Sequence, residues 1–215
     1  MLYKYIRRQH MEAFFRNGAL KIGSLYEYRA LEELGSIIGD ASEGVHITRL
    51  DSTKRREFQL QDGSPEAAFF KKHILGPDQQ NIEKKVVLAA GATLMAHSNS
   101  PNYYIYCVSS EYDERVMRQF GCDRCIEIVD PERFFKAISK NIRHKASFEG
   151  CFPVSYGNKT TDHLNPHEAH PALLKDDSYS DQKEIRAIWK PFKEPKGSLF
   201  INAPKAARHC REYRS

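Results

Sequence analysis

Short apolar patterns of two kinds alternate along this chain. A first strand is predicted at residues 2–6, where tyrosines alternate with Lys4. A helix is predicted at residues 9–16, where apolar side chains recur at helical spacing. Gly18 ends that helix, because glycine adopts the left-handed backbone conformation without steric cost.

A second strand is predicted at residues 20–28, from a loose alternation that closes with Tyr26, Tyr28 and Arg29. In a strand, residues 26 and 28 share one side, so their rings can form one stacking platform with a guanidinium beside it. The alternative is that both tyrosines pack in the core of the protein.

A polar, glycine-rich segment follows over residues 35–44 and carries Asp40 and Glu43. Glycines allow a backbone to approach a ligand closely, and two carboxylates there can bind ribose hydroxyls. An ordinary hairpin with a solvated loop is the alternative interpretation.

The rest of the chain continues the mixture of strands and helices. The run at residues 103–109 is aromatic and β-branched and apolar on both faces, which predicts a central strand. At residues 130–132, Asp-Pro-Glu is typical of a helix start. Further strands are expected within 45–60 and at 125–129, 152–156, 184–189 and 198–201, and further helices at 65–75 and 115–120; residues 86–95 fit either, and 158–170 read as a long loop.

Strands outnumber helices, and this predicts a single α+β domain over residues 1–215 with a mixed, mainly antiparallel sheet. Of the 215 residues, 40% are hydrophobic and 28% charged, which is typical of a folded protein. The net charge is +5, with a basic tail from about residue 204. This mild excess favours an anionic partner such as a nucleotide or a nucleic acid.

Several functional classes lack their signatures. The apolar runs are shorter than a membrane span of ~20 residues, and residues 1–20 contain no signal-peptide core, so a cytoplasmic protein without a membrane segment is expected. P-loop, GxGxxG, HExxH and GxSxG motifs are absent.

Cys122 and Cys125 have the spacing of two ligands in a metal site. The candidates that could complete such a site are His163, His167 and His170. No second CxxC follows, and Cys125 begins an apolar strand pattern. We therefore predict no bound zinc.

Five short motifs occur in a fixed order: YKY at 3–5, NGAL at 17–20, CVS at 107–109, VSY at 154–156 and EIR at 184–186. This order resembles a family of bacterial proteins described only as a domain of unknown function. It resembles, more distantly, the ADP-ribosyltransferase fold of toxins and phage-defence effectors. The second resemblance implies that NAD is the substrate, that ADP-ribose is transferred to a nucleic acid or protein, and that an antitoxin is a possible partner.

The resemblance also implies roles for single residues. Tyr3 or Lys4 takes the first-strand position that holds NAD, Tyr26 and Tyr28 stack on nicotinamide, Ser109 takes the place of the conserved serine and Glu184 that of the catalytic glutamate. By their chemistry, Arg186 or Arg29 can pair with the pyrophosphate.

Cleavage of the nicotinamide–ribose bond builds an oxocarbenium-like cation, which a carboxylate such as Glu184 can stabilise. The same carboxylate can orient ribose hydroxyls or deprotonate the acceptor. The alternative is that Glu184 and Arg186 form a structural ion pair on a sheet face. Two rival functions stay open: a non-enzymatic nucleotide or nucleic-acid binder that stacks bases on Tyr26 and Tyr28, and a nuclease that holds a metal ion with Asp40 and Glu43.

Overall fold

The computed structural model describes residues 1–33, 43–79, 83–165 and 169–214, with only the backbone for 31–33. These residues divide into two units. The first comprises Met1–Gly44, Pro101–Gly157 and Ala172–Ser215, and the second comprises Val45–Ser100 and Asn158–Pro171. Each unit is compact and has a hydrophobic core of its own.

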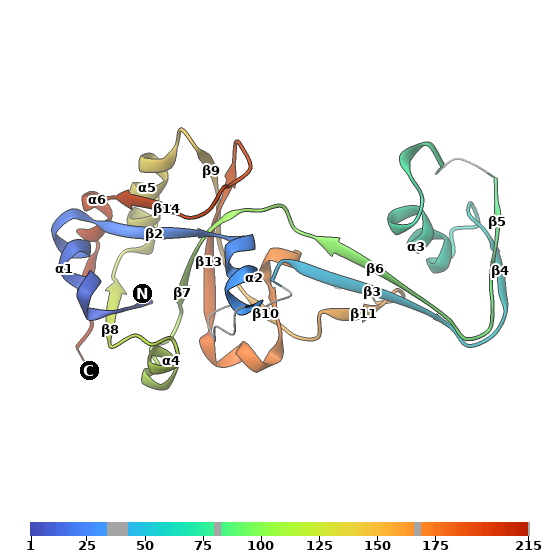
Figure 1. Cartoon of the computed structure of the whole chain (residues 1–215), viewed down its shortest axis with the longest axis horizontal. Coiled ribbons are helices and arrows are strands. Elements are labelled where there is room, and N and C mark those ends of the chain that lie inside the picture. The colour runs from blue at the N-terminus through green and yellow to red at the C-terminus, as the bar shows by residue number, and fades with distance from the viewer. Residues whose placement is uncertain (34–42, 80–82, 166–168, 215) are drawn as a thin grey trace. The chain divides into compact units, whose positions relative to one another are not determined.

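An antiparallel sheet built around β7 forms the first unit (Figure 1). Strand β13 pairs with β7 along the whole length of β7, from Glu184 opposite Ser109 to Trp189 opposite Tyr104. The order across the sheet is β14-β2-β7-β1-β8-β15, with β13 and then β9 attached to β7. The strands are β1 (Leu2–Ile6), β2 (Ala19–Ser24), β7 (Tyr104–Ser109), β8 (Arg124–Ile128), β9 (Ala146–Pro153), β13 (Glu184–Pro191), β14 (Leu199–Asn202) and β15 (Cys210–Glu212); β10 (Ser155–Tyr156) and β12 (Leu174–Lys175) form a separate parallel pair.

On its other edge, β7 is shared between two strands. Strand β2 pairs with Tyr104 and Ile105 at one end, and β1 pairs with Ser109 at the other. The ladders of the described residues therefore leave residues 106–108 without a strand partner on this edge. The sheet splits at this point, and the split positions the candidate site.

The helices of the first unit pack on the sheet around an apolar core that includes Phe14, Phe134 and Trp189. Helix α5 begins as predicted, because the Asp130 side chain accepts a hydrogen bond from the backbone N–H of Arg133 and Pro131 follows at the first position. The helices are α1 (Arg8–Asn17), α2 (Leu25–Glu33), α4 (Glu114–Gln119), α5 (Pro131–Ile142) and α6 (Pro204–Ala207), with the 3₁₀ turns η2 (Pro171–Leu173) and η3 (Asp177–Gln182).

Helix α1 ends at Gly18, as predicted, with φ at 66°. A side chain at this position would also clash, because a Cβ on Gly18 would lie 2.1 Å from the carbonyl carbon of Ala203. Glycine is therefore required here both for the left-handed turn and for the close approach of the segment before α6.

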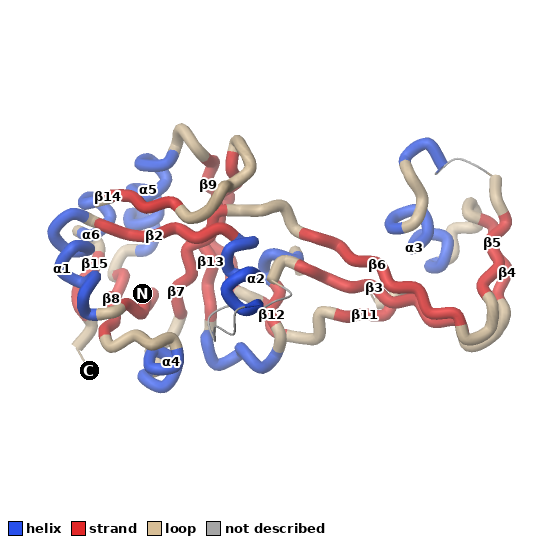
Figure 2. The backbone as a smooth tube through the Cα atoms, viewed as in Figure 1, coloured by secondary structure: helices blue, strands red, loops and turns tan. Residues whose placement is uncertain are grey.

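The second unit has a core of its own, which includes Leu50, Leu60 and Phe69. Its three-stranded sheet pairs β3 with β6 antiparallel and with β11 parallel (Figure 2). Its elements are β3 (Val45–Ser52), β4 (Arg56–Gln59), α3 (Pro65–His73), η1 (Pro77–Gln79), β5 (Lys85–Leu88), β6 (Ala92–Asn99) and β11 (Thr160–Asp162).

Most of the predicted elements are present: the fold is a mixed α/β fold with mainly antiparallel sheets, and the run at 103–109 is a central strand. The strand predicted at 20–28 is wrong in its second half, because β2 ends at Ser24 and α2 begins at Leu25. The reason is local. Ser24 accepts a hydrogen bond from the backbone N–H of Glu27 at 3.2 Å, which starts a helix at a Ser-x-x-Glu sequence.

Two other expectations about the chain also change. The long loop expected at 158–170 contains strand β11, which pairs with β3. The strand expected at 152–156 is the end of β9 followed by the separate strand β10.

Candidate functional site

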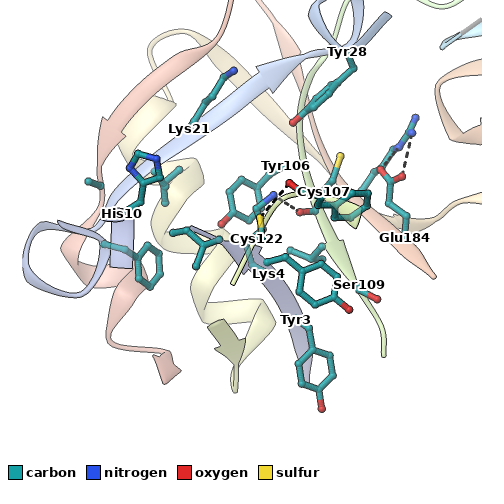
Figure 3. Close-up of a pocket in the computed structure, with 18 of the residues that line it drawn as sticks. Tyr3, Lys4, His10, Lys21, Tyr28, Tyr106, Cys107, Ser109, Cys122 and Glu184 are labelled. Carbon is teal, nitrogen blue, oxygen red and sulfur yellow. Dashed lines mark hydrogen bonds and ion pairs between the residues drawn. The ribbon is translucent and has the colours of Figure 1, made fainter. Parts of the chain in front are cut away.

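A cavity of about 670 Å³ lies where the sheet of the first unit splits. Its walls come from β1, α1, β2, β7, β13 and β14, and both aromatic and charged side chains line it. Figure 3 shows that Lys4 and Tyr28 point towards the interior, whereas Tyr3 points away from it. A cavity of this size can hold a ligand as large as a dinucleotide.

Four charged side chains form a network at one wall of the cavity. On β13, Arg186 Nε lies 2.7 Å from Glu184 Oε1, and Lys175 Nζ lies 2.9 Å from Glu184 Oε2. Arg186 Nη1 also lies 2.6 Å from Glu43 Oε1, and Arg186 donates to the carbonyl oxygen of Ala172. All four side chains are at most 6% exposed, so each charge depends on the others.

The network fixes the protonation of its members. Burial would raise the pKa of Glu184, but the charges of Arg186 and Lys175 outweigh it and hold that pKa well below its usual value. Burial would lower the pKa of Lys175, but Glu184 and Glu43 hold it above its usual value. Near neutral pH, Glu184 is therefore a carboxylate and Lys175 an ammonium.

Ser109 lies at the end of β7 opposite Glu184 and is 5% exposed. Its hydroxyl oxygen lies 2.6 Å from the carbonyl oxygen of Glu111 and 3.0 Å from that of Gln182. Because a hydroxyl has one proton, these two carbonyls compete for it. Ser109 thus ties β7 to the turn before β13, beside the cavity that it lines.

Tyr28 stands on α2 and reaches the cavity over Gly23 of β2. A Cβ on Gly23 would lie 2.6 Å from Cε2 of Tyr28, so the tyrosine ring occupies the space that a side chain at residue 23 would need. Burial raises the pKa of Tyr28 well above its usual value, and the nearby thiol of Cys107 and carboxylate of Glu184 act in the same direction. The phenol is therefore protonated and can donate a hydrogen bond.

Lys4 projects from β1 into the split of the sheet. Its ammonium donates to the carbonyl oxygen of Cys107 at 2.8 Å and lies 4.6 Å from the centre of the Tyr106 ring. Among the residues that the structure describes, no carboxylate lies within 4.0 Å of Lys4 Nζ. Lys4 is thus a cation with neutral partners in a cavity whose two carboxylates are already paired.

The structure brings most of the predicted site residues to this one cavity. Those that line it are Tyr3, Lys4, Tyr28, Glu43, Ser109, Glu184 and Arg186. Tyr26 and Arg29 do not line it: Arg29 lies over the Tyr26 ring at 4.6 Å and donates two hydrogen bonds to the carbonyl oxygen of Glu43. Asp40 lies outside the described residues.

The predicted platform of Tyr26 and Tyr28 is therefore wrong. Successive residues of an α-helix turn by about 100°, so residues 26 and 28 of α2 point to different sides. Tyr26 is 37% exposed, whereas Tyr28 packs against Leu25 and Ile105.

Sequence reasoning missed Lys175 and Gln182. Lys175 Nζ donates to Gln182 Oε1 at 2.7 Å, which directs the ammonium towards Glu184. Lys175 lies in the two-residue strand β12 and Gln182 in the 3₁₀ turn η3, and both elements are too short to leave a periodic pattern in the sequence. One signal could have pointed to a residue such as Lys175. Glu184 begins a predicted apolar strand, and a glutamate buried there needs a cation within contact distance.

The two cysteines of the CxxC sequence, Cys122 and Cys125, lie in different environments. Cys125 is buried among Tyr5, Val116 and Met117, and Cys122 is half-buried and lines the cavity. His163 and His170 belong to the second unit, and His167 lies outside the described residues. Within the described ranges, no three His, Cys, Asp or Glu side chains are grouped to hold a metal ion.

Comparisons with family models, with curated proteins and with solved structures found no match to this chain. None of the helices in the described part is long and apolar enough to cross a bilayer. The cavity and its charges are therefore the basis of the functional argument.

Proposed function

We propose that the chain has an ADP-ribosyltransferase-like fold and uses NAD to transfer ADP-ribose to a nucleic acid or protein acceptor, as a toxin or phage-defence effector. The observation that carries the proposal is a buried glutamate, Glu184, that is paired with Arg186 and Lys175 in the wall of a cavity large enough for a dinucleotide. The resemblance of the YKY, CVS and EIR motifs supports it, because all three contribute to this cavity.

The charged groups of the cavity differ in whether they are free to bind a ligand. Glu184 and Glu43 are neutralised by Arg186 and Lys175, so Lys4 is the group that attracts a phosphate. Tyr28 also lines the cavity, and its hydroxyl can donate a hydrogen bond to the ligand. An aromatic wall that includes Tyr28 and Tyr106 suits a planar ring of the ligand.

The low pKa of Glu184 favours one of its two possible roles. A carboxylate held well below its usual pKa is a poor base, so we assign it the stabilisation of charge. As the bond between C1′ of the ribose and nicotinamide breaks, nicotinamide leaves with the electron pair. The cationic ribose is stabilised by the carboxylate until the acceptor forms a bond to C1′ and releases its proton to water.

The experiment is to incubate the purified protein with NAD and measure free nicotinamide, with and without RNA, DNA or a protein extract. Wild type should release nicotinamide, and Glu184→Gln should lose at least ~10²-fold in rate, as for removal of one charge-stabilising group. The matched control is Glu127→Gln: Glu127 is also a buried strand glutamate paired with an arginine, but it does not line the cavity. An active Glu184→Gln protein with unchanged stability contradicts the proposal.

One observation favours a second candidate function, a nucleotide-binding protein without catalysis. Glu184 and Arg186 satisfy each other in the interior, as a purely structural pair would. This candidate predicts that ADP-ribose binds and that Lys4→Met weakens the binding. It also predicts that no nicotinamide is released under any of the conditions above.

A further inference from the structure

An unpaired positive charge lies on the exposed sides of α5 and α6 and on the residues that directly follow these two helices. Six cations form this surface, which we call the basic helical face: Lys136, Lys140, Arg143, Lys145, Lys205 and Arg208. All six are exposed, and among the described residues none lies within 4.0 Å of a carboxylate. Several other exposed arginines pair with acids, as Arg118 does with Glu114 and Arg16 does with Glu12.

Helical geometry places these side chains together. At about 100° per residue, Lys136, Lys140 and Arg143 lie within roughly 60° of one another on α5. The opposite side of that helix carries Phe134, Ile138 and other core residues. The face also holds one acid, Glu132 at the start of α5, so a clear positive excess remains.

Helix α6 extends this face. Its buried residues, Ala206 and Ala207, are small and let α6 pack closely on α5, so the exposed Lys205 and Arg208 belong to a helix that lies directly beside α5. Figure 1 shows α1, α5 and α6 gathered at the same end of the first unit.

The basic helical face is connected to the candidate site. Asn141, between Lys140 and Arg143 along α5, donates a hydrogen bond to the carbonyl oxygen of Asn202 at 2.8 Å. Asn202 ends β14 and lines the cavity. A polyanion that lies along α5 is therefore next to the wall of the cavity.

We propose that the basic helical face binds the phosphate backbone of a nucleic acid and that this nucleic acid is the acceptor; the second half of this proposal rests on the proposed function. Unpaired exposed cations release counterions when they meet phosphates, which gives sequence-independent binding. One exposed large hydrophobic residue borders the face, because the backbone N–H of Phe192 donates a hydrogen bond to the carbonyl oxygen of Lys145. The six cations favour a polyanion, and the test below separates this from attachment to a membrane surface.

The test compares two triple variants of the same net charge. Lys136→Ala/Lys140→Ala/Lys205→Ala removes three cations of the basic helical face. Lys54→Ala/Lys72→Ala/Lys84→Ala removes three exposed lysines of the second unit, which also lack ion pairs among the described residues. Binding of a labelled single-stranded RNA, and of DNA of the same sequence, is measured by fluorescence anisotropy over a range of salt concentrations.

The first triple variant should bind RNA about tenfold more weakly, and its plot of log K against log salt should be shallower by about 2, for three lost phosphate contacts at ~0.7 each. The second should match wild type. Equal weakening by both variants, or no RNA binding by wild type, overturns the proposal. So does binding to vesicles containing phosphatidylserine that RNA does not compete away, since this assigns the face to a membrane.

Nicotinamide release without an acceptor separates the two proposals. If the first triple variant still releases nicotinamide but no longer labels RNA with ADP-ribose, both proposals are supported. If it releases nicotinamide and labels RNA as wild type does, the basic helical face is not the acceptor site and the proposed function survives. If wild type binds RNA but releases no nicotinamide, the proposed function and the acceptor assignment fail together, and only backbone binding survives.

Discussion

Arg186 and Glu184 stand two residues apart on β13, on the same face of the strand, and form an ion pair of 2.7 Å in the interior of the protein. Because both side chains are almost fully buried, neither charge can be hydrated if the other is removed. This relationship is the basis of the first two predictions.

Arg186→Met should destabilise the protein by about 3–5 kcal/mol, since it leaves Glu184 and Glu43 buried beside a single cation, Lys175. The measurement is the free energy of unfolding in urea. The control is Arg118→Met, which removes an exposed pair with Glu114 and should stay close to wild type. Similar losses in both variants would show that burial does not govern the pair.

The stability should depend on acid pH through Glu184. Its pKa is lower in the folded protein than in the unfolded chain, where it is about 4.3, so its contribution is complete above the unfolded value. The contribution is lost as the pH falls towards the folded pKa. The melting temperature of wild type should therefore fall below about pH 4, and this fall should be smaller in Glu184→Gln. The result that counts against this is an identical acid dependence in both proteins.

The sequence predicted the central strand and the helix start at Asp130 because each rests on local chemistry: an apolar run and an N-terminal cap. Most of the site residues that it selected line the cavity, although they are a minority of the residues that form its walls. The loose alternation at residues 20–28 predicted that Tyr26 and Tyr28 lie in a strand. They lie in a helix, because the Ser-x-x-Glu sequence at residues 24–27 starts α2.

What could not be predicted depends on contacts between distant segments. The split of the sheet arises because β1 and β2 share one edge of β7. Lys175 meets Glu184 only through the fold of the segment that precedes β13. Neither relationship leaves a pattern in the sequence.

Arg29 should act on the site through Glu43 and not through contact with the ligand. Its guanidinium donates to the carbonyl oxygen of Glu43 at 2.9 and 2.6 Å, and the Glu43 carboxylate meets Arg186. Arg29→Ala should fold and should bind ADP-ribose several-fold more weakly, whereas Arg29→Lys should recover part of the loss. The measurement is calorimetric titration with ADP-ribose. If Arg29→Lys is no better than Arg29→Ala, the hydrogen bonds to Glu43 are not the cause.

The protein should contain no zinc. Burial raises the pKa of Cys125 to about 12 and also raises the pKa of Cys122, so both thiols are protonated near neutral pH, whereas zinc binds thiolates. The Cys122 thiol lies 3.7 Å from the carbonyl oxygen of Phe120, and the Cys125 thiol lies 3.7 Å from that of Ile126. Metal analysis of the purified protein decides the point. One equivalent of zinc that disappears in Cys122→Ser would contradict the prediction.

Tyr28 and Gly23 should be coupled, because the Tyr28 ring occupies the space of a Gly23 side chain. A Cβ on Gly23 would lie 2.6–2.7 Å from Cε2, Cζ and Oη of Tyr28. A Cβ cannot come this close to any of these three atoms, so one of the two side chains must move. Gly23→Ala must therefore displace the ring from the cavity wall. The expected cost is about 1–3 kcal/mol of stability, together with loss of ADP-ribose binding.

A double-mutant cycle tests this coupling. In a Tyr28→Ala background the space next to Gly23 is open, so Gly23→Ala should then cost little, and the two changes should differ from additivity by about 0.5–3 kcal/mol. Tyr28→Phe keeps the ring against Gly23 and should retain the stability of wild type, but it should bind ADP-ribose more weakly because the donor hydroxyl is gone. Urea unfolding of the four proteins of the cycle measures the coupling, and additive costs would show that the ring does not rest on Gly23.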